Sequence, residues 1–193
     1  MINTELPTNI PQGLEDGTIR NLMALTGPDF DIEAIAARLA KINRFGGATK
    51  WPYSVATHSV LVSALCPKQY RWPGLLHDIT ESFGINDMIS PVKRAMPHYK
   101  LLEAAIRAQL LAPFGLELDE PEAVKTADER AYQLECYYLR GAWPRTEHTR
   151  FAVAEVSLRE WVLAERFLTT EIPWQNSARM FLAAYNDMCD TDF

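Results

Sequence analysis

The stretch Leu75–Glu81, LLHDITE, places an adjacent histidine and aspartate inside an apolar run of helical character. An imidazole nitrogen and a carboxylate are each costly to bury without a partner. A divalent cation offsets both costs, because imidazole and carboxylate are common metal ligands. This stretch therefore predicts a chain that folds around a metal site, with further ligands supplied by other segments.

Two more polar residues lie on the apolar faces of expected helices. In the helix expected over about residues 52–67, His58 shares one face with apolar residues and so points towards the interior. In the helix expected over about residues 119–141, Asp128 also falls on the apolar face. Three helices that direct polar groups into one interior indicate a single metal site. The expected ligands, in chain order, are His58, His77, Asp78 and Asp128.

Helical periodicity covers most of the chain, and neither strand-like alternation nor an internal repeat is found. The first 30 residues are rich in Pro, Gly, Asn and Thr, which predicts an irregular arm. We therefore predict an all-α protein, a compact single-domain helical bundle over residues 31–193 preceded by the arm at residues 1–30. The expected helices span about residues 31–45, 52–67, 73–84, 97–111, 119–141, 151–168 and 174–188.

Size and composition bound the class of protein. The 193 residues are enough for one well-buried domain and too few for two ordinary ones. The formal charge of -6, with basic residues scattered along the chain, argues against a nucleic-acid polymer as partner. Three distant cysteines without C-x-x-C spacing fit a reducing compartment. No apolar run has membrane-spanning length, so we expect a cytoplasmic protein without a membrane partner.

The order of these motifs resembles that of the HD-domain metal-dependent phosphohydrolases. The chain is similar in particular to bacterial HD-domain 5'-deoxynucleotidases and to phage HD-type dNTP triphosphohydrolases, including the dATP type. The likeness covers roughly residues 30 to 140, with one extra residue between Glu81 and Asp87 and with Phe45 where the 5'-deoxynucleotidases have tryptophan. The matching segments are Ile42–Phe45, Ser54–Ser59, Leu76–Glu81, Asp87–Lys93 and Val124–Asp128.

The resemblance implies an all-α HD fold that holds one divalent ion. Two imidazoles and two carboxylates suit cobalt, manganese, zinc or iron, and the residues do not choose among these metals. The resemblance further implies a small-molecule deoxynucleotide substrate, attacked at the α-phosphorus to release the nucleoside plus phosphate or triphosphate. It also implies a homo-oligomer. Mono- and triphosphates share this bond chemistry, so the motifs leave the two open.

Three residues match catalytic positions of these relatives. Glu81 corresponds to the catalytic glutamate, an acid/base group, although it could instead hold a ligand histidine. Arg44 is expected to clamp phosphate, because a guanidinium binds phosphate through two prongs; its alternative is a surface cation at a helix end. Asp87 is expected near the sugar or the attacking water, with turn capping as the alternative.

Substrate contacts are expected from three further residues. Lys93 could neutralise phosphate or lie at a solvated helix entry. Phe45 and Trp51 flank the Gly46-Gly47 turn and could stack on a base, while plain core packing is the alternative.

Two other functions remain open from the sequence. One is hydrolysis of a signalling nucleotide, although the further motifs usual in such relatives are not found. The other is a non-catalytic helical interaction module stapled by the metal. A phosphate clamp beside the ligands has no use in a staple, which favours the enzyme.

Overall fold

The computed structural model describes residues 6–85, 92, 95–144 and 152–190. Within these residues the chain is all-α apart from one short hairpin, which confirms the predicted fold class. The α-helices are α1 (Ile32–Lys41), α2 (Val55–Leu65), α3 (Arg71–Leu76), α5 (Pro97–Leu111), α6 (Glu122–Arg140), α7 (Leu158–Leu168) and α8 (Trp174–Cys189). The 3-10 turns are η1 (Gly27–Phe30), η2 (Arg44–Gly47), η3 (Lys68–Tyr70), η4 (Ile79–Phe83), η5 (Ala112–Phe114) and η7 (Val153–Glu155).

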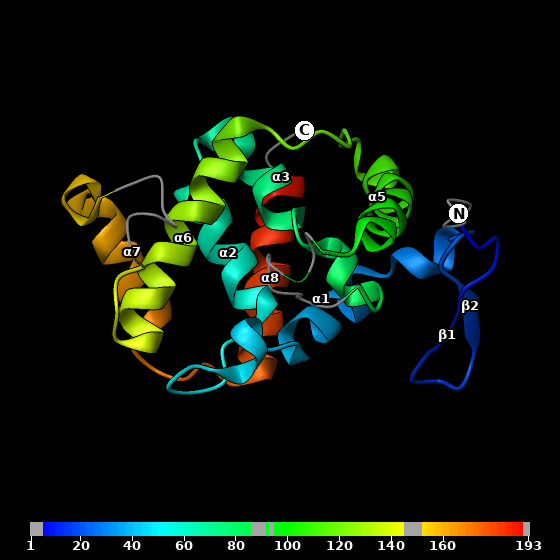
Figure 1. Cartoon of the computed structure of the whole chain (residues 1–193), viewed down its shortest axis with the longest axis horizontal. Coiled ribbons are helices and arrows are strands. Elements are labelled where there is room, and N and C mark those ends of the chain that lie inside the picture. The colour runs from blue at the N-terminus through cyan, green and yellow to red at the C-terminus, as the bar shows by residue number, and fades with distance from the viewer. Residues whose placement is uncertain (1–5, 86–91, 93–94, 145–151, 191–193) are drawn as a thin grey trace.

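Helix α2 is the centre of the bundle. It packs against α3, α6, α7 and α8, while α1 packs on α8. Figure 1 shows α2 in the middle, α7 at one end, and α5 with the N-terminal hairpin at the other. Every residue of α2 from Val55 to Ser63 is buried, as expected of a helix that is surrounded by other elements in the core. No helix in the described parts of the chain is long and apolar enough to cross a membrane.

Side-chain caps fix the starts of the first two helices, close to the predicted starts at about residues 31 and 52. The Asp31 carboxylate accepts hydrogen bonds from the backbone amides of Glu33 and Ala34 and so begins α1. The Ser54 hydroxyl accepts from the amide of Thr57 and begins α2. Because α2 begins at this cap, His58 lies one turn inside it, in the buried middle of the molecule.

The predicted continuous helix over residues 73–84 is wrong. Helix α3 ends at Leu76, Asp78 has φ -100° and ψ 19°, and the chain continues as the 3-10 turn η4 up to Gly84, which has φ 81°. Aspartate has a low helix propensity, so a break here costs little. A 3-10 turn has three residues per turn, which keeps apolar residues on nearly the same face and hides the break from a periodicity search.

The arm at residues 1–30 is more regular than predicted in its described part. Strands β1 (Pro11–Gly13) and β2 (Ile19–Asn21) pair antiparallel, with Gln12 opposite Arg20. The arm also joins the main core, since Leu22 is buried in it. The Gln109 amide of α5 holds the arm by accepting from the Leu25 amide at 3.0 Å and donating to the Leu22 carbonyl at 3.2 Å.

Candidate functional site

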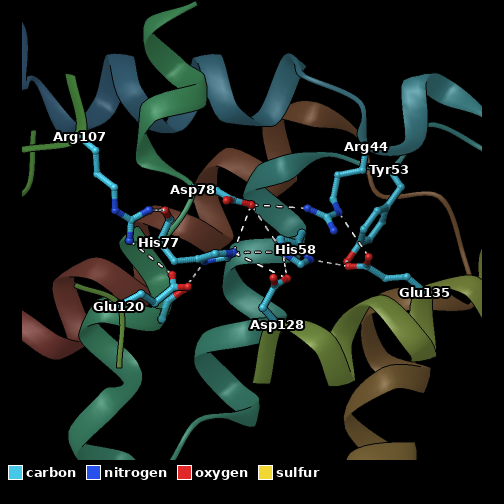
Figure 2. Close-up of polar contacts among 10 residues, drawn as sticks. Arg44, Tyr53, His58, His77, Asp78, Arg107, Glu120, Asp128 and Glu135 are labelled. Carbon is cyan, nitrogen blue, oxygen red and sulfur yellow. Dashed lines mark hydrogen bonds and ion pairs between the residues drawn. The ribbon is translucent and has the colours of Figure 1, made fainter. Parts of the chain in front are cut away.

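Four side chains from three segments converge in the middle of the bundle. Figure 2 shows His58 of α2, His77 and Asp78 of the break after α3, and Asp128 of α6 pointing toward one another. The two histidine Nε2 atoms are 3.2 Å apart. His77 Nε2 lies 3.1 Å from Asp78 Oδ2, and His58 Nε2 lies 3.1 Å from Asp128 Oδ1. The remaining histidine–aspartate pairs are 3.6 Å and 3.9 Å apart.

These separations match the edges of a coordination polyhedron. Ligand atoms about 2.1 Å from a common cation lie about 3.0 to 3.4 Å apart in octahedral or tetrahedral arrangements. His58, His77 and Asp128 form a group that could hold a metal ion, with all three ligand atoms within 4.8 Å of one another. Asp78 is close enough to both histidines to complete the set.

The hydrogen bonds of the two rings fix where their lone pairs point. His77 Nδ1 lies 2.8 Å from the Gly74 carbonyl oxygen, which only accepts, so Nδ1 carries the hydrogen. His58 Nδ1 lies 2.6 Å from Glu135 Oε1 and donates to that carboxylate. In their neutral forms both rings therefore present Nε2 lone pairs to each other and to two carboxylates. Four acceptors that converge in this way require a cation or protons between them.

Without a metal, protons would serve this purpose. Burial by itself lowers the pKa of His77, but the carboxylates of Asp78, Asp128 and Glu120 outweigh burial and raise it to about 10. Burial and Arg44 lower the pKa of His58, and Glu135 with Asp128 more than reverse this, so that it too is raised. The surroundings of both rings thus favour a bound positive charge, which a divalent cation would also provide.

The cluster is closed on its histidine side and open on its aspartate side. The side chains of His58 and His77 are 0% and 4% exposed, whereas those of Asp78 and Asp128 are 23% and 43% exposed. A small molecule would therefore approach past the two carboxylates.

Glu135 is the main functional residue that the sequence patterns miss. Its fully buried carboxylate accepts from His58 Nδ1 and, at 2.9 Å, from the Tyr53 hydroxyl, and it lies 3.3 Å from Arg44 Nε. Burial raises its pKa, but Arg44 and His58 outweigh burial and lower it below the ordinary value, so it remains a carboxylate. A signal was present: Glu135 follows Asp128 by two helical turns and so lies on the same face of α6.

His77 is held from another side by backbone contacts. Besides the bond from its ring to Gly74, its own carbonyl oxygen accepts from Arg107 Nη1 at 2.6 Å. Arg107 in turn lies 3.4 Å from Glu120 Oε1. Figure 2 shows this pair on the side of the cluster opposite Glu135, Tyr53 and Arg44.

Arg44 lies at the edge of the cluster. Its guanidinium is 11% exposed and reaches Asp78 Oδ2 at 3.5 Å as well as Glu135. Phe45, the next residue, has the left-handed angles φ 58° and ψ 21°, and its ring lies 6.0 Å from that of Tyr132. A left-handed phenylalanine is strained, and such strain is concentrated at functional sites. Trp51 packs against the hydrophobic core.

The other predicted site residues are placed in part. Glu81 is buried in η4, one turn after the His-Asp pair and beyond the break, so it does not lie on one continuous α-helix with His77, as the predicted helix over residues 73–84 would require. Asp87 and Lys93 lie outside the described residues.

Comparison with known proteins adds a family but no activity. No protein-family model matches the sequence. An uncharacterized protein of Rhodobacter capsulatus is 35% identical over 144 residues, which cover 67% of this chain and 73% of the relative. The chain belongs to the family of that protein. It is also similar to the uncharacterized protein YfdR of Escherichia coli, with 40% identity over 100 residues.

The second likeness is partial. It covers 52% of this chain and 56% of YfdR, so the chain spans little more than half the length of that relative. Neither relative's name states an activity. The chemistry of this family member must therefore be inferred from the site itself.

Proposed function

We propose that this protein is a metal-dependent phosphohydrolase of the HD type, acting on deoxynucleoside 5'-phosphates. The observation that carries the proposal is the meeting of two Nε2 lone pairs and two carboxylates within coordination distance of one another. An arginine at the edge of the same cluster adds a group suited to phosphate. The motif order that resembles HD-domain phosphohydrolases supports the assignment to this chemistry.

In the proposal the metal is held by His58, His77, Asp78 and Asp128. A bound divalent cation would polarise a phosphate ester and lower the pKa of a nearby water. The open aspartate side fits a site that admits a substrate, because a purely structural metal site is closed by its protein ligands.

The chain's own residues then divide the remaining work. Arg44 binds a phosphate oxygen from the Asp78 side of the cluster and balances the negative charge of both carboxylates beside it. Glu81 moves the proton between water and the leaving oxygen of the sugar. Asp87 and Lys93 are proposed to orient the sugar and to neutralise phosphate, and Phe45 and Trp51 to contact the base. The expected homo-oligomer and cytoplasmic location stay predictions.

The direct test is hydrolysis by the purified protein loaded with Co²⁺ or Mn²⁺. A panel of deoxynucleoside mono-, di- and triphosphates is incubated with it, and the products are separated by chromatography. We expect a deoxynucleoside together with phosphate from a monophosphate, or with triphosphate from a dNTP, which also separates the two substrate classes.

Matched variants tie the activity to the site. Asp128→Asn should abolish turnover, whereas His98→Ala should leave it unchanged, because the exposed His98 lies outside the cluster. Glu81→Gln should retain metal and lose about 10²- to 10⁴-fold in kcat, the usual range for removal of an acid/base group. Intact substrates at high concentrations of metal-loaded enzyme, or turnover that survives Asp128→Asn, would refute the proposal.

A further inference from the structure

His77 directly follows the end of α3 and is the first of two adjacent residues in the proposed metal site. Helix α3 stops at Leu76, and Asp78 leaves the helical backbone angles. The last carbonyls of a helix lack partners inside it and need donors from elsewhere. Here the His77 ring donates to the Gly74 carbonyl, and Arg107 donates to the His77 carbonyl at 2.6 Å. His77 therefore supplies both a proposed metal ligand, its ring Nε2, and a carbonyl oxygen that accepts a hydrogen bond from the Arg107 guanidinium of α5.

Arg107 is itself held in place. It projects from α5, and its second terminal nitrogen lies 3.4 Å from Glu120 Oε1, in the segment just before α6. The two side chains are 21% and 23% exposed, so water screens this ion pair only in part. Arg107 thus joins α5, the turn after α3, and the segment that leads to the helix of Asp128.

A charged donor on this carbonyl controls the direction of two ligands. The peptide unit between His77 and Asp78 is planar, so fixing its oxygen fixes the plane from which both residues depart. His77 Nε2 and Asp78 Oδ2 lie 3.1 Å apart, and a rotation of this peptide would move one relative to the other. A hydrogen bond from a guanidinium is about twice as strong as a neutral one, which suits it to hold this turn in place.

We propose that Arg107 is a positioning residue of the metal site, and that Glu120 sets the orientation of its guanidinium. The inference rests on the proposed metal site but concerns residues that touch neither metal nor substrate. Arg107 holds the His77–Asp78 peptide in the geometry that aims both side chains at the cation.

The test measures metal binding without any substrate. Co²⁺ is titrated into Arg107→Ala, and both the Kd and the visible spectrum at saturation are recorded. We expect the Kd for Co²⁺ to rise about tenfold, the lower end of the range for residues that hydrogen-bond to metal ligands without binding the metal themselves. We also expect the saturated spectrum to differ from that of the wild type, since the coordination geometry changes. Arg107→Lys, which retains one charged donor, should recover most of the affinity.

Two controls separate positioning from general loosening of α5. Gln109→Ala removes the bonds between α5 and the N-terminal arm and should lower stability without changing the Co²⁺ spectrum. Lys100→Ala removes one exposed positive charge from the same helix and should leave the Kd unchanged. If Arg107→Ala does not fold, Glu120→Gln takes its place, with an expected rise of about threefold in Kd, below the range for directly supporting groups.

The outcomes distinguish this inference from the proposed function. A wild-type protein that binds no Co²⁺ would overturn the metal site itself. A wild type that binds Co²⁺, together with an Arg107→Ala variant of equal Kd and identical spectrum, would overturn only the role of Arg107. An equal loss of affinity in Gln109→Ala would also overturn it, because the effect would then belong to α5 as a whole.

Discussion

The two histidines of the cluster are held by opposite means. His58 donates from Nδ1 to the buried Glu135 carboxylate, which also contacts Tyr53 and Arg44. His77 donates from Nδ1 to a backbone carbonyl, and its own carbonyl accepts from Arg107. The His58 side is thus built from charged side chains in a dry interior, and the His77 side mainly from the backbone at a helix end.

This difference has an electronic and an energetic consequence. A carboxylate behind an imidazole raises its basicity as a ligand more than a neutral carbonyl does. Loss of a partner costs more for a buried charge, as on the His58 side, than for a neutral backbone carbonyl, as on the His77 side. We therefore expect the His58 side to determine both stability and affinity, and the His77 side to determine mainly geometry.

The largest effects should follow from removal of either histidine. His58→Ala and His77→Ala should each weaken Co²⁺ binding more than the roughly 100-fold limit for supporting groups, because a ligand itself is lost. In the presence of a chelator, His58→Ala should be the less stable variant by about 2 kcal/mol, the worth of a hydrogen bond to a buried charge. Cobalt titration and urea unfolding measure the two quantities.

His98→Ala is the matched control, since His98 is exposed on α5 and outside the cluster. It should bind Co²⁺ and unfold like the wild type. Equal stability of His58→Ala and His77→Ala in the presence of a chelator would contradict the proposed difference between the two sides. It would mean that the hydrogen bond from His58 to Glu135 does not stabilise the fold.

Glu135→Gln should produce the next largest effect. The amide has nearly the shape of the carboxylate but no charge, and its NH₂ group faces either the donors of His58 and Tyr53 or the donor of Arg44. We expect the Kd for Co²⁺ to rise about 10- to 100-fold. Stability should fall by about 3 kcal/mol, since Arg44 loses its buried partner. Isothermal titration and urea unfolding provide the readouts.

Glu165→Gln on the exposed face of α7 controls for the loss of one negative charge and should change neither quantity. If Glu135→Gln lost less affinity for Co²⁺ than Arg107→Ala does, the His77 side would determine affinity more than the His58 side, contrary to our expectation.

The contrast also explains what the sequence could predict. His58 and Asp128 could be found because each interrupts an apolar face of regular helical period, and the helix start at Ser54 could be found because its cap is local. The all-α class follows from the same periodicity over the whole chain. These are signals that a few neighbouring residues carry by themselves.

The remaining features depend on contacts that no local pattern contains. Glu135 meets His58 across 77 residues of sequence, so its position on the Asp128 face indicated burial but not its partner. The break at Asp78 is a backbone event at a residue that was expected inside a helix. Arg107 acts on a carbonyl oxygen, which every residue possesses and no sequence pattern distinguishes.

The smallest effect on metal binding is expected from a substitution that only crowds the His77 side of the site, where α3 packs against α2. A Cβ at Gly74 would lie 2.8 Å from Cys66 Sγ and 3.4 Å from the Ser63 Cα, because α3 crosses α2 closely at this point. Gly74→Ala should therefore push α3 away and cost about 1 to 3 kcal/mol, the usual cost of overpacking a core. It should weaken Co²⁺ binding less than Glu135→Gln does, since the carbonyl that His77 contacts is retained.

A second substitution makes this cause testable. Cys66→Ala removes the sulfur that the new methyl group meets, and its own cost is that of a small cavity. The double variant should be more stable than the sum of the two single losses predicts, by about 0.5 to 1 kcal/mol, because contacting residues are not additive. Urea unfolding of all four proteins measures this coupling. Strict additivity would mean that the clash is relieved elsewhere, and that the close approach of α3 to α2 does not set the place of His77.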